Sequence, residues 1–286
     1  MASTDRASGH SSSSAGRAVT TTTTYSGPAP PMPSPVPFRD LARDTAESSP
    51  DPRIESAIAN TQSFPQPKLR LKIQDLGHSG ATKFLAAVNP AAVLSTAVDN
   101  VLRLLYKSPS ETDTTVPPTR SVTLILRDMG GVAYTTGTAL DNDHKEIHFS
   151  LAYINSISPP SRLTDEITGV LTHELVHCYQ WNAHGTCPGG LIEGVADWVR
   201  LKCDLGPPHW KKETTGDWDR GYQHTAYFLQ YLEGRFGEGT IRQLNDKLRQ
   251  HKYKAETFWL ELLGESVIKL YDDYVKSEEG GNKDNE

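Results

Sequence analysis

The sequence predicts an α+β fold in which a small mixed sheet precedes a mostly helical half. Between residues 69 and 154, short segments alternate apolar and polar side chains, as half-buried strands do. From Leu163 onward, almost every segment instead has the apolar spacing of an α-helix. The chain has 286 residues, which is enough for one large domain or two small ones.

The N-terminal segment differs in composition from the rest of the chain. It contains serine and threonine runs at residues 11–14 and 20–24, followed by closely spaced prolines over residues 28–37. Such a segment has too little apolar surface to offset the entropy lost on ordering. We therefore expect a disordered arm over residues 1–65, a folded domain over 66–277 and a disordered acidic tail over 278–286.

Within the expected domain, the apolar patterns define the order of the elements. Strands are predicted at residues 69–73, 122–126, 132–136 and 146–154. Helices are predicted at residues 81–106 and 164–179, and from about Leu191 and Gly221 onward. Pro90 lies inside the first helical pattern and is expected to kink or split it. Pro159 and Pro160 end the strand region just before the helix at 164–179.

Charge and apolar content exclude some partners. The net charge is -6 and the isoelectric point is near 5.9, so neither nucleic acid nor an anionic membrane is an expected partner. The first thirty residues lack the apolar core of a secretory signal. No later run approaches the roughly 20 apolar residues of a membrane span. By default, we expect a monomeric, cytoplasmic protein.

The chain has three cysteines, Cys178, Cys187 and Cys203. An odd number argues against a complete disulfide framework. A Cys178–Cys187 bridge is the alternative in an oxidising compartment, but buried free thiols are the default expectation.

The segment His173-Glu174-Leu175-Val176-His177 has the spacing of a zinc site. Residues four apart lie one above the other on a helix, so both imidazoles can point at one ion. Glu174 lies about 100° round the helix, beside the metal, where it can accept a proton from a zinc-bound water. The segment therefore predicts Zn²⁺ as the cofactor and Glu174 as a general base.

A catalytic zinc needs a third protein ligand and an open position. Glu193 follows the second histidine by sixteen residues, near the start of the next predicted helix. Asp197 lies one turn further on and can accept the second N–H of a ligating imidazole. Asp197 is also the alternative third ligand, because both carboxylates share one helix face. The metzincin arrangement is disfavoured, because it would need Gly at 180 and His at 183, where this chain has Gln180 and Ala183.

Hydrolysis also needs a donor for the developing oxyanion. Tyr222 is the first candidate and His224 the second, although Tyr222 can instead belong to the core stripe of its helix. Arg200 is expected either to pair with Asp197 or to bind a substrate carboxylate, and pairing is the simpler role.

Several longer segments resemble the plant basic secretory proteins, a family regarded as zinc metallopeptidases. These segments are residues 173–181, 190–202, 221–222 and 225–229. The second of them reads GLIEGVADWVRLK and is far more specific than the zinc pentapeptide alone. The similarity covers about residues 68–275 and leaves the arm and the acidic tail outside.

This resemblance implies a zincin-like fold, one zinc ion and a peptide or protein substrate. It implies His173 and His177 as metal ligands, Glu174 as the catalytic base, and Glu193 or Asp197 as the third ligand. Two departures matter: the chain is acidic rather than basic, and no secretory signal is visible. The extracellular defence roles suggested for the plant proteins are therefore not carried over, while secretion by another route stays open.

The sequence thus favours a zinc-dependent peptidase with His173, His177 and Glu193 as ligands and Glu174 as base. The strand at residues 147–154 is expected to hold the substrate in extended form by strand addition. Two alternatives stay open: a non-catalytic binding protein on a zincin scaffold, and a zinc hydrolase of non-peptide substrates.

Overall fold

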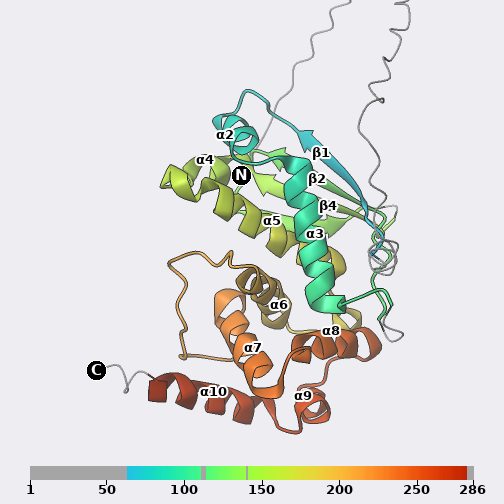
Figure 1. Cartoon of the computed structure of the whole chain (residues 1–286), viewed down its shortest axis with the longest axis vertical. Helices are drawn as coiled ribbons and strands as arrows, with labels where there is room; N and C mark the ends of the chain where they lie inside the picture. Colours follow the sequence, from blue (N-terminus) through green and yellow to red (C-terminus); the bar gives the residue numbers. More distant parts are fainter. Residues whose placement is uncertain (1–62, 111–113, 140, 282–286) are drawn as a thin grey trace, which may run out of the picture. The chain divides into compact units, whose positions relative to one another are not determined.

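The computed structural model describes residues 63–110, 114–139 and 141–281, which form the sheet and the helices of Figure 1. Four strands make one mixed sheet in the order β1-β2-β4-β3. They are β1 (Lys68–Ile73), β2 (Ser121–Arg127), β3 (Ala133–Gly137) and β4 (His144–Ser150). β1, β2 and β4 run parallel, whereas β3 pairs antiparallel with β4. The predicted α+β fold, with a small mixed sheet before a mostly helical part, is confirmed.

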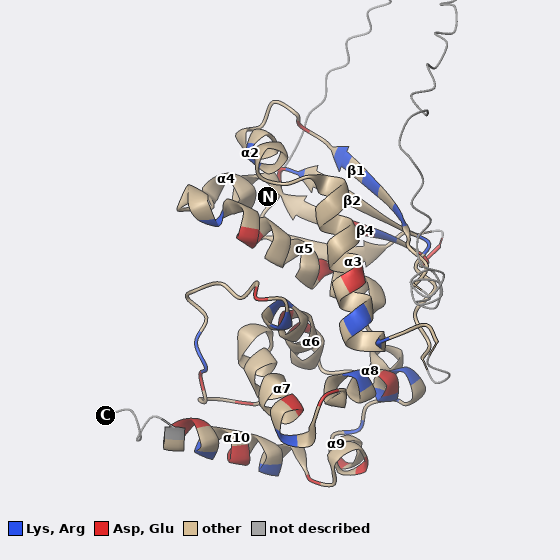
Figure 2. Ribbon diagram, in the orientation of Figure 1, with Lys and Arg blue, Asp and Glu red and all other residues tan. Residues whose placement is uncertain are grey.

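The two outer strands of the sheet have different chemistry. β1 carries exposed Lys68, Arg70 and Lys72 in alternation with apolar residues, and Figure 2 shows basic residues along this strand. Charged side chains on an outer strand disfavour pairing with another chain. β3 carries no lysine or arginine and has exposed Tyr134 instead. Of the two outer strands, β3 therefore offers the edge that is less protected against strand addition.

The prediction of a strand over residues 146–154 is wrong at its C-terminal end. β4 ends at Ser150, and the helix α4 (Leu151–Ser156) begins at the next residue. The Ser150 hydroxyl accepts a hydrogen bond from the backbone N–H of Tyr153, so it is the N-cap of α4. β4 also lies between β2 and β3. It therefore has no free edge, and the strand that ends the sheet on this side is β3.

The first helical segment is split, as Pro90 predicted. α2 (Ser79–Ala87) and α3 (Pro90–Tyr106) meet at a bend of 66°. The Asn89 side chain accepts hydrogen bonds from the N–H groups of Ala91 and Ala92, and Pro90 takes the first helical position, where no N–H is needed. α3 packs against α5 (Leu163–Tyr179) and β1, and α5 also contacts β3 and β4.

The helical part continues with α6 (Gly189–Lys202), α7 (Tyr222–Phe236), α8 (Thr240–Gln250), α9 (Ala255–Leu263) and α10 (Val267–Gly281). α6 packs most extensively against α7 and also against α5. Glycines allow this close approach, since a Cβ on Gly194 would lie 2.3 Å from Thr225 Cγ2. A Cβ on Gly190 would lie 1.7 Å from the carbonyl oxygen of Asp219. The start of α6 is thereby held against the connection that leads into α7.

The ends of the expected domain fall differently. α10 continues past residue 277 to Gly281, so the expected acidic tail begins within a helix. The remainder of that tail and nearly all of the expected arm lie outside the described residues. All three cysteines are free; Cys178 is buried and the other two are half-buried. No single helix in the described ranges is long and apolar enough to span a membrane; only α2 and α3 together meet that test, across their bend.

Candidate metal centre

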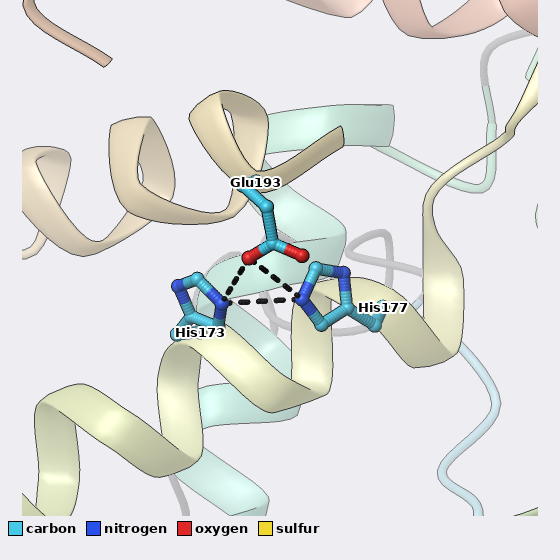
Figure 3. A group of neighbouring side chains, drawn as sticks. All are labelled: His173, His177 and Glu193. Atoms are coloured by element: carbon cyan, nitrogen blue, oxygen red, sulfur yellow. Dashed lines mark hydrogen bonds and ion pairs between the residues drawn. The ribbon is translucent and has the colours of Figure 1, made fainter. Parts of the chain in front are cut away.

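Three side chains from two helices converge on one point (Figure 3). His173 and His177 lie one turn apart on α5, and Glu193 reaches them from α6. The two Nε2 atoms are 3.1 Å apart. Glu193 Oε2 lies 3.1 Å from Nε2 of His173 and 3.7 Å from Nε2 of His177. These two imidazoles and one carboxylate form a group that could hold a metal ion.

α5 presents this group because its opposite side is held in the core. Ile167, Leu171 and Leu175 lie on that side and have no exposed surface. Asp165 and Glu166 lie in the first turn, where their negative charge interacts favourably with the helix dipole and stabilises the helix. The packing of one face thus fixes the rotation of the helix and turns both histidines toward α6.

Each imidazole has a second partner on its Nδ1 atom. Asp197 Oδ1 lies 2.7 Å from His173 Nδ1, and Asp197 is almost completely buried. The side-chain nitrogen Nε2 of Gln180 lies 2.6 Å from His177 Nδ1. For an imidazole Nε2 to bind a metal, Nδ1 must carry the proton, and the Asp197 carboxylate accepts that proton from His173. With a metal bound, the Gln180 amide would turn its oxygen toward the Nδ1–H of His177.

The ionisable side chains of this group shift each other's pKa values. Burial lowers the pKa of His173, but hydrogen bonds to Asp197 and Glu193 raise it more, to about 9. Burial raises the pKa of Glu193, but its hydrogen bonds to the two histidines hold the pKa of that carboxyl well below its usual range. A negative carboxylate thus lies beside two imidazoles, an arrangement that favours a cation.

Glu174 points from α5 toward the edge strand β3. The Thr135 hydroxyl lies 2.6 Å from Glu174 Oε2 and 2.9 Å from the Glu174 backbone oxygen. Glu174 is buried, and both residues line the same cleft as the two histidines. β3 therefore fixes the direction of the carboxylate that the sequence predicts as a base.

Tyr222 does not join the core stripe of α7. Its side chain is 58% exposed and lies over the His173 imidazole, with ring centres 6.2 Å apart and planes within 13°. Its φ angle is 47°, and it follows Gly221, whose φ is 88°. The negative charge of Glu193, followed by burial, raises the pKa of the Tyr222 hydroxyl, so this hydroxyl keeps its proton and can donate it. His224 is instead buried, with its Nε2 2.8 Å from the Tyr271 hydroxyl.

These residues line a cleft of about 1220 Å³. Its floor is one face of α5, where Glu166, Val170, His173, His177 and Gln180 follow each other at helical spacing. One wall is β3 with the turn before it, and the other is formed by α6, the connection after it and the start of α7. A groove of this size is large enough for several residues of an extended ligand.

The pairing predicted between Arg200 and Asp197 is wrong. The Arg200 guanidinium instead bonds Glu166 on α5, with Nη2 3.2 Å from Oε2. Helical geometry explains the difference, because Asp197 turns toward His173 and leaves Arg200 to cross α5 beside Gly169.

Two residues of the site were not predicted from the sequence. Gln180 could have been found, because it follows His177 by three residues, at the C-cap of α5. Thr135 carries no such signal, since it lies 39 residues before Glu174 on another element.

Comparison with known families gives the class of protein, a family described as peptidases. Residues 66–274 match the family model BSP, described as a peptidase of plants and bacteria. The chain therefore belongs to this family, as its resemblance to the basic secretory proteins suggested, and the membership supports a peptidase-type function with peptide or protein substrates. Searches of curated proteins and of solved structures gave no significant match.

Proposed function

We propose that this protein is a single-zinc peptidase with a zincin-like active site. The observation that carries the proposal is the triangle of donor atoms from His173, His177 and Glu193. Two ligands bound to one zinc ion at about 2.1 Å and tetrahedral angles lie about 3.3–3.4 Å apart. The three separations of 3.1, 3.1 and 3.7 Å bracket this value.

The donor set also suits the chemistry. Three protein ligands leave an open position, as catalytic zinc sites do. Bound there, Zn²⁺ would supply a Lewis acid that acidifies water and polarises the peptide carbonyl. The same three donors can also hold Fe(II), so metal analysis belongs to the test.

The residues around the triangle have separate roles in this proposal. The Glu174 carboxylate accepts the proton of the attacking water and returns it to the leaving amine. Thr135 holds that carboxylate in place through its 2.6 Å hydrogen bond. Tyr222, exposed above His173, donates a hydrogen bond from its hydroxyl to the oxyanion. Asp197 keeps the His173 proton on Nδ1.

The substrate strand is assigned to β3 rather than to residues 147–154. β3 ends the sheet beside the cleft, and exposed Val132 and Tyr134 line it. A peptide in extended form could add to this edge through backbone hydrogen bonds, with its scissile bond over the histidines.

A Glu174→Gln variant tests the mechanism. We expect it to keep one zinc per chain and to lose about 10²- to 10⁴-fold in kcat/KM on casein or a peptide library. Glu213→Gln is the matched control, because Glu213 lines the same cleft but is half-exposed and paired with Arg220 at 3.8 Å.

Two outcomes would count against the proposal. Cleavage by Glu174→Gln at the wild-type rate would exclude the proposed base. A purified protein without stoichiometric zinc, and without activity after zinc is added, would favour a binding protein on the same scaffold.

A further inference from the structure

The Arg200 guanidinium reaches the cleft one helical turn away from the metal centre. Arg200 comes from α6 and crosses α5 at Gly169, where a Cβ would lie 2.4 Å from its Nε. Gly169 precedes His173 by four residues, which is about 6 Å along a helix. A side chain on a substrate residue next to the scissile bond spans a similar distance. Because Gly169 has no side chain, the Arg200 guanidinium fits at the place where such a substrate side chain would lie.

The structure holds this guanidinium in one position. Its Nε donates to the Leu205 carbonyl at 2.9 Å, and its Nη2 donates to Glu166 at 3.2 Å. The Trp210 ring covers it at 5.1 Å, and Arg200 is only 6% exposed. Nη1 has no hydrogen bond within the described part of the chain. It keeps some accessible surface, since it is absent from the fully buried atoms that lack a partner there. The two N–H groups of Nη1 are therefore left for a ligand in the cleft.

The charges around Arg200 do not cancel. Glu166 also accepts a hydrogen bond from Arg162 at 3.0 Å, and its second oxygen accepts one from the Tyr153 hydroxyl at 2.9 Å. Two guanidinium groups thus share one carboxylate, which leaves one positive charge. Val170, Pro207 and Trp210 line the same end of the cleft with apolar surface. A cation fixed between apolar walls favours a negative group of compact shape.

We propose that Arg200 forms a subsite for a substrate carboxylate on a residue that adjoins the scissile bond. The inference rests on the proposed peptidase function and names its preferred substrate class. The carboxylate can come from the side chain of Asp or Glu inside a peptide, or from the C-terminus of a short peptide. Both sources offer two carboxylate oxygens to Nη1 of Arg200.

A peptide series measures this preference in the full-length zinc enzyme. One glutamate is moved through each position of an otherwise neutral, C-terminally amidated peptide, and glutamine replaces it in a matched set. Mass spectrometry locates each cut. We expect cuts to gather next to the glutamate, with kcat/KM about tenfold higher than for the glutamine peptide. Neutral peptides with a free C-terminus form the second arm, and a cut gathered at that end identifies the other source.

Two variants connect the preference to Arg200. In Arg200→Met, the ratio of the two kcat/KM values should fall to within about twofold of one. This ratio does not depend on how much of the variant is folded, because folded enzyme cancels from it. Arg235→Met is the matched control: like Arg200, Arg235 is paired with carboxylate (Glu265 and Asp273) and lies about as close to an aromatic ring, at 5.0 Å, but it does not line the cleft. Its ratio should equal that of the wild type.

The inference is overturned if neither arm shows a preference, or if Arg200→Met keeps it. It is also overturned if Arg235→Met loses the preference equally. Fluorescence anisotropy measures binding of the same peptides to the Glu174→Gln variant. It gives the ratio of affinities for the glutamate and glutamine peptides without turnover. Absence of cleavage by the wild type would therefore refute the peptidase proposal, while the binding ratio still decides whether Arg200 recognises a carboxylate.

Discussion

Glu193 and Asp197 lie one turn apart on α6, but they contact different ring nitrogens of His173. Glu193 Oε2 is 3.1 Å from His173 Nε2, and Asp197 Oδ1 is 2.7 Å from His173 Nδ1. Glu193 Oε2 also lies 3.7 Å from His177 Nε2, so this geometry supports Glu193 as the proposed third ligand. We predict that zinc affinity falls most in Glu193→Ala, less in Asp197→Ala and least in Asp197→Asn.

The magnitudes follow from the contacts that each variant loses. Structural zinc sites with four ligands bind with about 10–16 kcal/mol, or about 2.5–4 kcal/mol per ligand, so Glu193→Ala should lose roughly 10²- to 10³-fold. Asp197→Ala leaves the Nδ1–H of His173 buried without a partner, which costs about 1–3 kcal/mol, or roughly 5- to 150-fold. Asp197→Asn keeps an oxygen for that N–H and should stay within about tenfold of the wild type.

Competition with a chromophoric chelator at one fixed neutral pH measures these affinities. Thermal unfolding of each metal-free variant checks that it is folded before titration. Glu213→Ala, in the same cleft but outside the metal group, should bind zinc as the wild type does. The reasoning is refuted if Asp197→Ala loses more affinity than Glu193→Ala, because Asp197 would then be the ligand.

Three further predictions concern positioning, packing and acid–base behaviour. Thr135→Val removes the hydroxyl that bonds Glu174 and should lower kcat/KM about tenfold in peptide assays, whereas Thr135→Ser should stay within about twofold; equal losses would contradict the positioning role. A Cβ on Gly190 meets the Asp219 oxygen at 1.7 Å, so Gly190→Ala should lower the urea-measured free energy of unfolding by about 2–3 kcal/mol, while Gly189→Ala, in open space, should change it by under about 0.5 kcal/mol. Burial raises the pKa of Cys187 from 9.0 to about 12, so at about pH 8 this thiol should react with a disulfide reagent roughly 10²- to 10³-fold more slowly in the native protein than in urea. The folded chain keeps that proton to higher pH than the unfolded chain does, so this group's contribution to stability is lost as pH rises above about 9.

The elements of the fold could largely be predicted because periodicity is a local property. The split at Pro90 and the buried stripe of α5 both follow from residues within one or two turns of each other. The end of β4 could not be predicted in this way. Ser150 continues the alternating pattern of the strand, yet its hydroxyl caps a helix that begins at the next residue. The hydrogen bond of a helix-capping side chain competes with continuation of the strand. The alternation of apolar and polar residues does not reveal this bond.

The candidate site divides in the same manner. The placement of His173 and His177 on one face follows from helical spacing, and the two candidates on α6 follow from their separation of four residues. The choice between Glu193 and Asp197 depends on how α6 crosses α5, which no local pattern contains. The partner of Arg200 depends on the same crossing, because the lack of a Cβ at Gly169 leaves room for the guanidinium that bonds Glu166.

The position of β3 shows what a longer argument from the sequence could have recovered. β2 and β4 are parallel, so the chain must travel back between them, and residues 128–143 provide that return. β3 lies within this return and runs opposite to both. Because β2 and β4 pair directly with each other, β3 pairs at the other edge of β4 and ends the sheet. Its sequence AYTTG is short and polar, whereas VTLIL in β2 is nearly continuous in apolar residues, as interior strands are. The same return places Thr135 against Glu174 and leaves the outer edge of β3 unpaired among the described strands. One topological step would thus provide both the contact to the proposed base and the proposed edge for an extended substrate.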